Sequence, residues 1–564
     1  MRESGIHGEI LKRRPIACIF IAVGYLLLVP FHPSWAGEQN APVQAPPSTT
    51  EDTAAQPRSV REGNSSAADR HVVKLKVELV VVPVVVRDSA GRVVDDLGKG
   101  DFRIYDNRKL QDITQFAVEK FEQEPSVQAG GTALPGKFVA PGLFTALLFD
   151  DLHLDGETLP LVRNAALRRF SEQLSPTVRV GIFTTSGKVA LDFTDDRAKL
   201  AEALNQLTVS PRPNSSITDC LNMTHEEANW ILNRRDEDTK GALVTRAMRS
   251  CGIKDPVVAE KVVMETTERV LYMGDASTKQ ALEALVAVLR RLSTAPGQRS
   301  VVFISPGFLI SDREHREYEV IDLAVRNHVM ISSLDAGGLR GDSGDPEDSS
   351  PLGEFADGTG GSFYRNNNNL EAGIRRLSGF PELVYVLGFS PSNLKNDGAF
   401  HTIVVKLVGK GRFAAKWRQG YFAPKEAPGP AVSENREVSA AVFSRETLRG
   451  LPVEMRTHFV KDDKPVAKVT VMALVDLREL PHRESNGQNA NQLRVVAAVF
   501  DRNGKYIGSI DRRVSVEWQK EKAAVQEVTS FDFTLDSGDY LVRLVVRDAE
   551  SQSSFAQDSI MQIP

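Results

Sequence analysis

Residues 144–151 are Phe-Thr-Ala-Leu-Leu-Phe-Asp-Asp, and this stretch decides the fold. A short apolar run that ends in an acid is typical of a buried parallel strand, which brings its carboxylate to the carboxyl end of a sheet. A helix is expected next, because apolar residues recur at helical spacing between Leu159 and Leu174.

Strands and helices continue to alternate after this first pair. The pattern predicts further strands at 178–184, 189–193, 300–305, 329–334 and 383–389, and further helices near 196–207, 281–292, 318–327 and 370–377. Such alternation indicates a doubly wound α/β sheet with helices on both faces, and its ligands bind at the carboxyl ends of the strands. We expect this domain to cover residues 140–425.

A segment at about 210–273 interrupts the alternation and is predicted to be an inserted helical hairpin, built from helices near 226–232 and 257–270. It contains Cys220 and Cys251, for which a disulfide and two separate buried thiols are both open interpretations. The insertion either supplies binding specificity or is a surface excursion.

The N-terminus has the pattern of an export signal. Basic residues precede an apolar run from Ile16 to Val29, and small residues at Ser34 and Ala36 define a cleavage site, so residues 1–36 are expected to be removed. A retained membrane anchor is the alternative, but the run is shorter than the roughly 20 residues that a helix needs to cross a bilayer. Residues 37–70 have the composition of a disordered linker.

The two ends of the mature chain are rich in β-branched residues. Residues 71–122 predict a small N-terminal β module, in which 72–87 form one long strand or two strands joined near Pro83. Residues 426–440 predict a Pro-rich linker. Seven strand-like segments between 441 and 564 predict a C-terminal immunoglobulin-like β-sandwich, with a hairpin at Asp501-Arg-Asn-Gly504.

Composition narrows the classes of function. The chain has 564 residues, 41% hydrophobic and 25% charged, which fits a multidomain soluble protein. A net charge of −5 gives no basic footprint for nucleic acid. The three cysteines include no Cys-x-x-Cys pair, so a cysteine zinc site is excluded.

Five short blocks of sequence recur in a fixed order, which is more specific than any one block alone. They are 84–106, Phe149-Asp-Asp-Leu-His153, Asp357-Gly-Thr-Gly-Gly-Ser-Phe363, Tyr385-Val-Leu-Gly-Phe-Ser-Pro391 and Arg418-Gln-Gly-Tyr-Phe-Ala-Pro424. Together they resemble the VWFA-related domain family of acidobacterial type, over about residues 72–425. The resemblance implies a von Willebrand factor A fold, which is a protein-binding module, in an exported protein.

That fold often carries a metal-ion-dependent adhesion site, whose pattern is Asp-x-Ser-x-Ser after the first strand and Thr-Asp-Gly after the fourth. Here Asp150 matches the first acid, whereas Leu152 and Leu154 replace the serines and Ser305-Pro-Gly307 replaces Thr-Asp-Gly. The resemblance therefore implies a degenerate site.

A rearranged set of Asp150, Asp151 and Asp155 would be the alternative, and the cofactor it would take is a weakly bound Mg²⁺ or Ca²⁺. The other interpretation is that Asp150 and Asp151 cap the neighbouring turn and accept backbone N–H bonds.

Catalytic patterns are incomplete. Gly341-Asp-Ser-Gly-Asp345 is similar to the nucleophile loop of trypsin-like proteases, yet its composition is that of a loop and no histidine is placed beside it. His153 lacks metal-ligand spacing, and Thr185-Ser-Gly-Lys188 lacks the upstream glycine of a phosphate-binding loop.

We therefore expect an exported, non-enzymatic protein of adhesion or scaffold type, periplasmic or secreted, with no transmembrane span after cleavage. Its partner is expected to be a protein and not a nucleic acid. The candidate binding residues are Asp150, Asp151, His153, Asp155, Ser305 and the loop after Asp335. An exported hydrolase with its site in the same cleft or in the insertion, and a structural envelope component, are the alternative classes.

Overall fold

The computed structural model describes residues 80–564 except 90–91, 121–137, 173, 211–218, 311–315, 339–350, 380–382, 393–397, 410–412, 424–429, 462–465, 481–482, 486–487 and 520–523. The predicted signal peptide at 1–36, the linker at 37–70 and the Gly341–Asp345 loop lie outside these residues. Among the described helices, none is long and apolar enough to cross a membrane.

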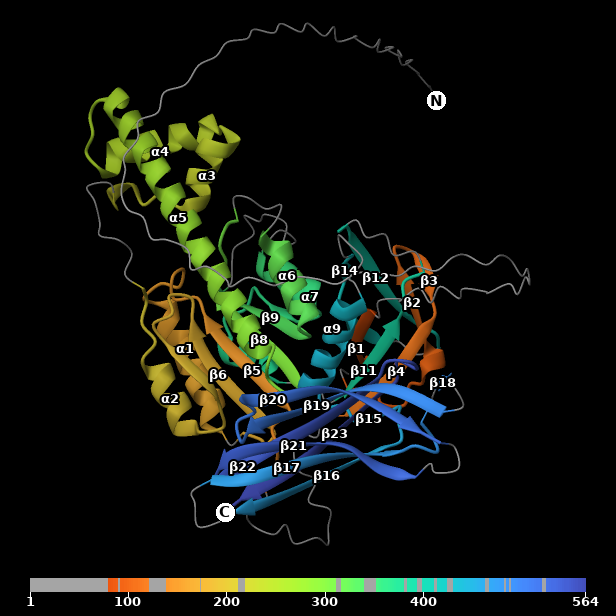
Figure 1. The fold of residues 1–564 in the computed structure, drawn as a ribbon. Coiled ribbons are helices and arrows are strands. Elements are labelled where there is room, and N and C mark those ends of the chain that lie inside the picture. Colours follow the sequence, from red (N-terminus) through yellow and green to blue (C-terminus); the bar gives the residue numbers. More distant parts are fainter. Residues whose placement is uncertain are drawn as a thin grey trace, which may run out of the picture. The chain divides into compact units, whose positions relative to one another are not determined.

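The central sheet has six strands in the order β10-β9-β8-β5-β6-β7 (Figure 1). Their bounds are β5 Leu143–Phe149, β6 Val178–Thr184, β7 Ala190–Thr194, β8 Gln298–Ser305, β9 Val329–Asp335 and β10 Phe363–Tyr364. All neighbours are parallel except β6 and β7, which are antiparallel. Numbered along the chain, the strands follow the doubly wound order 3-2-1-4-5-6.

Helices cover both faces of this sheet. One face packs against α1 (Thr158–Ser171), α2 (Arg197–Asn205) and α8 (Leu370–Leu377), and the other against α5 (Pro256–Leu292), α6 (Arg316–Arg326) and α7 (Pro351–Thr359). Successive residues of β5 serve opposite faces, since Leu147 and Phe149 lie in the first core while Phe144 and Leu148 lie in the second. This two-sided burial explains why β5 is an almost continuous apolar run.

The N-terminal β module differs from its prediction because it is completed by distant strands. The elements β1 (Val80–Arg87), β2 (Phe102–Asp106), β3 (Lys109–Gln111) and β4 (Ile113–Lys120) combine with β11 (Leu383–Phe389), β12 (Phe400–Leu407), β13 (Ala414–Trp417) and β14 (Gly420–Phe422). They form the sheets β13-β1-β11-β4 and β14-β12-β2-β3 around one core.

The assignment of 383–389 to the doubly wound sheet, and of 140–425 to one α/β domain, is therefore wrong. β11 pairs antiparallel with β1 and β4, so the α/β domain ends after α8 and is inserted into the β module. The apolar run of β11 is typical of a buried parallel strand. Hydrophobic periodicity alone does not indicate which sheet such a strand joins.

Among its described residues, the insertion contains three helices rather than a two-helix hairpin. The 3-10 turn η2 (Asp219–Leu221), α3 (His225–Arg234) and α4 (Glu237–Ser250) pack against the first half of α5. The predicted helices near 257–270 and 281–292 are one helix, α5, about 55 Å long at 1.5 Å per residue. Figure 1 shows its second half running along the sheet while α3 and α4 gather at its first half.

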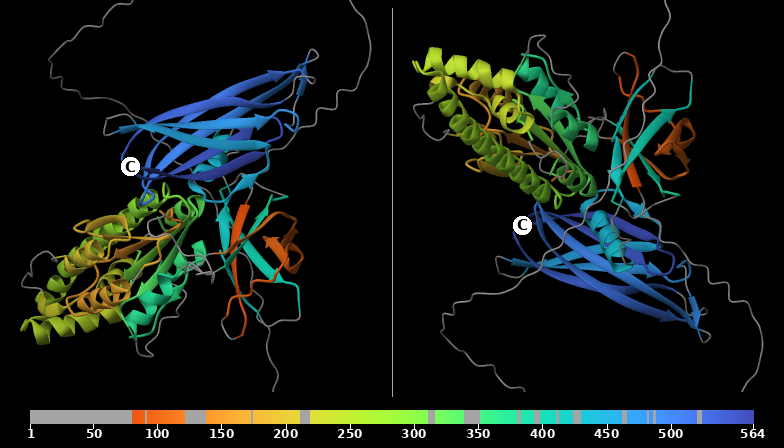
Figure 2. Two further views of the ribbon diagram at one scale, coloured as in Figure 1. Left: turned by 90° about the horizontal axis from the view of Figure 1, so that it is seen from below. Right: turned by 90° about the horizontal axis from the view of Figure 1, so that it is seen from above.

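The C-terminal part begins with a helix, because α9 (Pro430–Phe443) occupies most of the predicted linker at 426–440. Nine strands follow in the described part of the chain: β15 Leu448–Arg449, β16 Val453–Lys461, β17 Val466–Asp476, β18 Arg483–Ser485, β19 Gln488–Asp501, β20 Tyr506–Trp518, β21 Val525–Asp536, β22 Gly538–Asp548 and β23 Ser554–Ile563. They form the sheets β15-β23-β22-β19-β18, with β20 on β19, and β16-β17-β21, stacked over one core (Figure 2).

Candidate functional site

The site is built on Asp150, which follows β5 directly at the carboxyl edge of the central sheet. Its side chain is fully buried, and its backbone N–H donates to Ile304 O of the neighbouring strand β8 at 2.9 Å. The residue is therefore fixed by the sheet ladder, and its carboxylate lies beside the ends of β6 and β8.

Three side chains donate hydrogen bonds to the Asp150 carboxylate. The Ser305 hydroxyl at the end of β8 donates to Oδ2 at 2.7 Å, and the Thr185 hydroxyl after β6 donates to Oδ1 at 2.9 Å. His153 Nδ1 lies 2.9 Å from Oδ1 and 2.8 Å from Oδ2. Both carboxylate oxygens are thus engaged, as a buried charge requires.

The Asp151 carboxylate accepts hydrogen bonds from the turn between β6 and β7. Its Oδ1 accepts the Ser186 N–H at 2.9 Å, and its Oδ2 accepts the Ser186 hydroxyl at 2.5 Å. Thr185 Oγ1 lies 3.1 Å from Asp151 Oδ1, so its single proton is shared between Asp150 and Asp151. The predicted turn cap is present for Asp151, whereas Asp150 accepts its hydrogen bonds from the side chains described above.

His153 bridges the acid and an aromatic ring. Its imidazole stacks on Phe308, with ring centroids 5.2 Å apart and an interplanar angle of 28°. Nδ1 faces Asp150, while Nε2 is buried and has no hydrogen-bond partner within the described protein. The Asp150 contact orients the ring and leaves Nε2 as the one open polar atom of this histidine.

Asp155 does not join the other two acids. Its side chain is exposed, and Oδ1 accepts the backbone N–H groups of Glu157 at 3.0 Å and Thr158 at 2.6 Å, at the start of α1. Within the described ranges, no three His, Cys, Asp or Glu side chains are grouped to hold a metal ion. The rearranged ligand set of Asp150, Asp151 and Asp155 is therefore not assembled.

One of the two leucines that replace the serines of the metal-site pattern for Mg²⁺ or Ca²⁺ has a packing role. Leu154 is 3% exposed and packs with Leu159 in the core under α1, so it is a core residue and not a failed ligand. The Asp150 carboxylate accepts hydrogen bonds from the hydroxyls of Thr185 and Ser305 and contacts the His153 imidazole, so both of its oxygens already have partners within the protein.

The insertion reaches the site through α5. His225, the first residue of α3, packs over Gly274 of α5, where a Cβ atom would lie 2.3 Å from the His225 ring, and its Nε2 lies 3.0 Å from Asp275 Oδ1. One turn further on, the Thr278 hydroxyl donates to Leu309 O at 3.0 Å, in the loop that carries Phe308.

The pKa of His225 is shifted by its burial and by nearby charged groups, including His153. Burial lowers the pKa of His225 most, and a charge on His153 lowers the pKa further, while Asp275 raises it. His153 is thus the smallest of the influences on the pKa of His225, and it comes from a segment about 70 residues away in the sequence.

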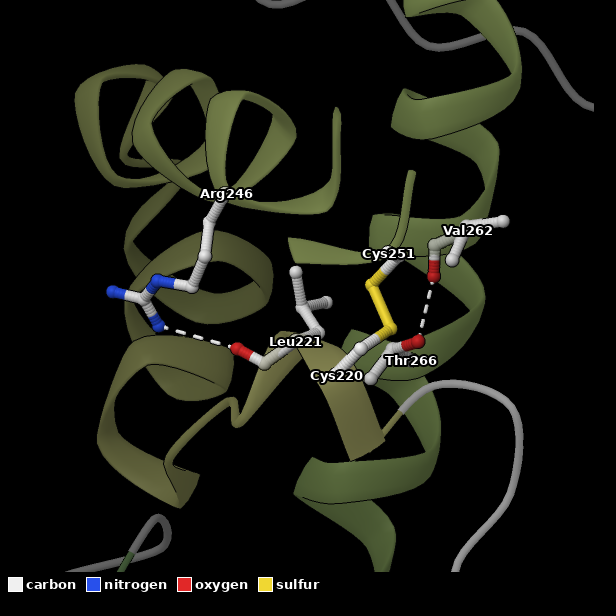
Figure 3. The surroundings of a disulfide bond; sticks show 6 residues. All are labelled: Cys220, Leu221, Arg246, Cys251, Val262 and Thr266. Carbon is white, nitrogen blue, oxygen red and sulfur yellow. Dashed lines mark hydrogen bonds between the residues drawn. A yellow bond between two sulfur atoms is a disulfide. The ribbon is translucent and has the colours of Figure 1, made fainter. Parts of the chain in front are cut away.

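The insertion is closed by a disulfide. Cys220 in η2 and Cys251 at the end of α4 are joined, with Cα atoms 5.3 Å apart (Figure 3). Beside it, Arg246 Nη1 donates to Leu221 O at 3.4 Å. The bond ties the segment before α3 to the end of α4, next to the first half of α5.

Several residues of the site were not predicted. Thr185, Ser186, Phe308 and His225 were not among the candidate residues, and Thr185-Ser-Gly-Lys188 was considered only as a phosphate loop. The position of Thr185 immediately after β6, the neighbour of β5, is a usable signal, because carboxyl ends of adjacent parallel strands meet at one edge. No local pattern links His225 to this edge.

No protein-family model matches the chain, and no curated protein matches it. Among solved structures, an aerotolerance-related membrane protein from Bacteroides fragilis is 13% identical over 42% of this chain and 98% of its own, with a TM-score of 0.22.

Two further structures are similarly distant. The conserved hypothetical protein BatB from Bacteroides thetaiotaomicron is 13% identical over 42% of this chain and 96% of its own, with a TM-score of 0.21. The ArnB paralog VWA2 from Sulfolobus acidocaldarius is 10% identical over 86% of this chain and 75% of its own, with a TM-score of 0.23. Scores this low carry no argument, so the assignment of a doubly wound α/β domain rests on the strand order and pairing described above.

Proposed function

We propose that the chain is an exported, non-enzymatic binding protein that recognises a protein partner at the carboxyl edge of the central sheet without a metal ion. The observation that carries this proposal is the internal saturation of Asp150 by His153, Thr185 and Ser305. An acid that is satisfied by protein donors has no need of a cation.

The surroundings of this edge support a binding role. Loops after β5, β6 and β8 meet there, and the disulfide-closed insertion is anchored beside it through α5. Loops on a rigid scaffold are common sites of recognition. We also propose that the protein is exported, either to the periplasm or out of the cell, and that its C-terminal β-sandwich is immunoglobulin-like. Both statements are predictions.

The proposal is tested with two crosslinker positions that flank one strand. Pro176 lies just before β6 and Lys188 lies in the turn after it, and both are exposed. A photoreactive residue at 188, and not at 176, is expected to capture a discrete envelope protein, equally with and without EDTA. Equal capture from both positions, or capture only with added metal, would contradict the proposal.

A hydrolase is the second candidate, because Asp150 orients His153 as an acid orients a catalytic base. A base must also reach a nucleophile, and in the described protein Nε2 has no hydrogen-bond partner. Hydrolysis of ester, peptide or glycoside substrates that His153→Ala abolishes and Asp155→Ala preserves would reverse our preference.

A further inference from the structure

A continuous set of contacts joins the insertion to the candidate site. His225 of α3 sits on Gly274 and Asp275, Thr278 on the next turn of α5 holds Leu309 O, and the preceding residue Phe308 stacks on His153. His153 in turn contacts Asp150.

We infer that His225 is a proton-sensitive latch that holds the insertion against the site and releases it in acid, and this inference rests on the proposed binding function. The His225 ring packs at a specific position on α5, because only a residue without a Cβ atom at position 274 leaves room for it. It also has an anchor in the hydrogen bond to Asp275.

Protonation acts against this arrangement for two reasons. The His225 side chain is only 18% exposed, so its charged form loses hydration, and a positive charge on His153 opposes its protonation further. Asp275, at 44% exposed, offsets part of this cost, yet the pKa of His225 stays below its usual value. On α3 itself, Glu227 is engaged by Arg246 of α4.

The sign of the pH effect follows from this direction. A histidine whose pKa is lowered in the docked state is neutral there and binds a proton more readily when released. Docking is fully stable above the unperturbed histidine pKa of about 6.5 and weakens as the pH falls below it. The loop at 306–310 should loosen with α3, since Thr278 of α5 holds it.

Hydrogen exchange of the full chain tests the latch. After correction for intrinsic exchange, amides of α3 and of residues 306–310 should lose protection together between pH 7.5 and pH 5.5. His225→Gln, which keeps an N–H donor for Asp275 and does not titrate, should abolish this loss. Loss of protection that is unchanged in His225→Gln, or confined to α3, would overturn the inference.

A second measurement covers the case in which His225→Gln does not dock. The His225 ring is followed by NMR in protein with labelled histidine, and its titration midpoint should rise in His153→Asn, because one of the groups that lowers its pKa is removed. An unchanged midpoint would show that the two rings are not coupled. Neither experiment measures partner capture, so the latch and the binding role can fail separately.

Discussion

Replacement of Asp150 by alanine is the sharpest test of the buried polar cluster. The substitution removes the acceptor of Ser305, Thr185 and His153 at once. Thr185 can turn its proton to Asp151 Oδ1, at 3.1 Å, but the Ser305 hydroxyl and His153 Nδ1 lose an acceptor.

The expected loss follows from these two donors. A buried donor left unsatisfied costs about 1–3 kcal/mol, so Asp150→Ala should lower the free energy of unfolding of the α/β domain by about 2–6 kcal/mol. Asp155→Ala is the matched control, because it removes an exposed acid that accepts N–H bonds at the start of α1 and should cost about 1 kcal/mol.

Scanning calorimetry of the full chain measures the difference at pH 7. Several domains unfold, so the transition of the α/β domain is identified first with Leu147→Ala, which creates a cavity in its core. An Asp150→Ala shift no larger than that of Asp155→Ala would refute the reasoning that Asp150 organises a buried network.

Two further predictions concern packing outside this cluster. Gly504 has φ of +77°, and a Cβ atom there would lie 2.3 Å from Phe144 Cζ, so Gly504→Ala should destabilise the protein by about 1–3 kcal/mol in the same calorimetry. Gly508→Ala, where nothing lies within 4 Å, should have little effect, and similar losses in both would contradict the contact. Replacing both Cys220 and Cys251 by serine should destabilise the insertion by about 2–4 kcal/mol, seen as faster proteolysis within α3 and α4 but not in the C-terminal strands. Unchanged cleavage would mean that the disulfide does not brace these helices.

Local sequence patterns predicted individual strands but not every strand pairing. β6 was predicted at its observed bounds and β8 nearly so, because buried strands between helices leave a strong apolar pattern. The sheet that β11 joins was not predictable in this way, since pairing with β1 depends on contacts between residues slightly more than 300 positions apart and not on local periodicity.

The residues of the candidate site were likewise predicted only in part. Asp150, Asp151, His153 and Ser305 were predicted from their places at strand ends, and the structure brings them to one edge, while Asp155 turns away to the start of α1. His225 could not be found, because it reaches the site only when the insertion folds back on α5. The insertion was misjudged as a hairpin, since nothing in its pattern marks that α5 is continuous through 256–292.

Metal independence is the central claim, and the melting temperature of the full chain tests it most directly. The transition of the α/β domain is recorded in EDTA and with millimolar Mg²⁺, Ca²⁺ or Mn²⁺, beside the Asp150→Ala variant. A ligand that binds only the native state raises its stability, so the proposed self-satisfied Asp150 predicts the same melting temperature in all four solutions. A rise specific to one metal, lost in Asp150→Ala, would contradict it.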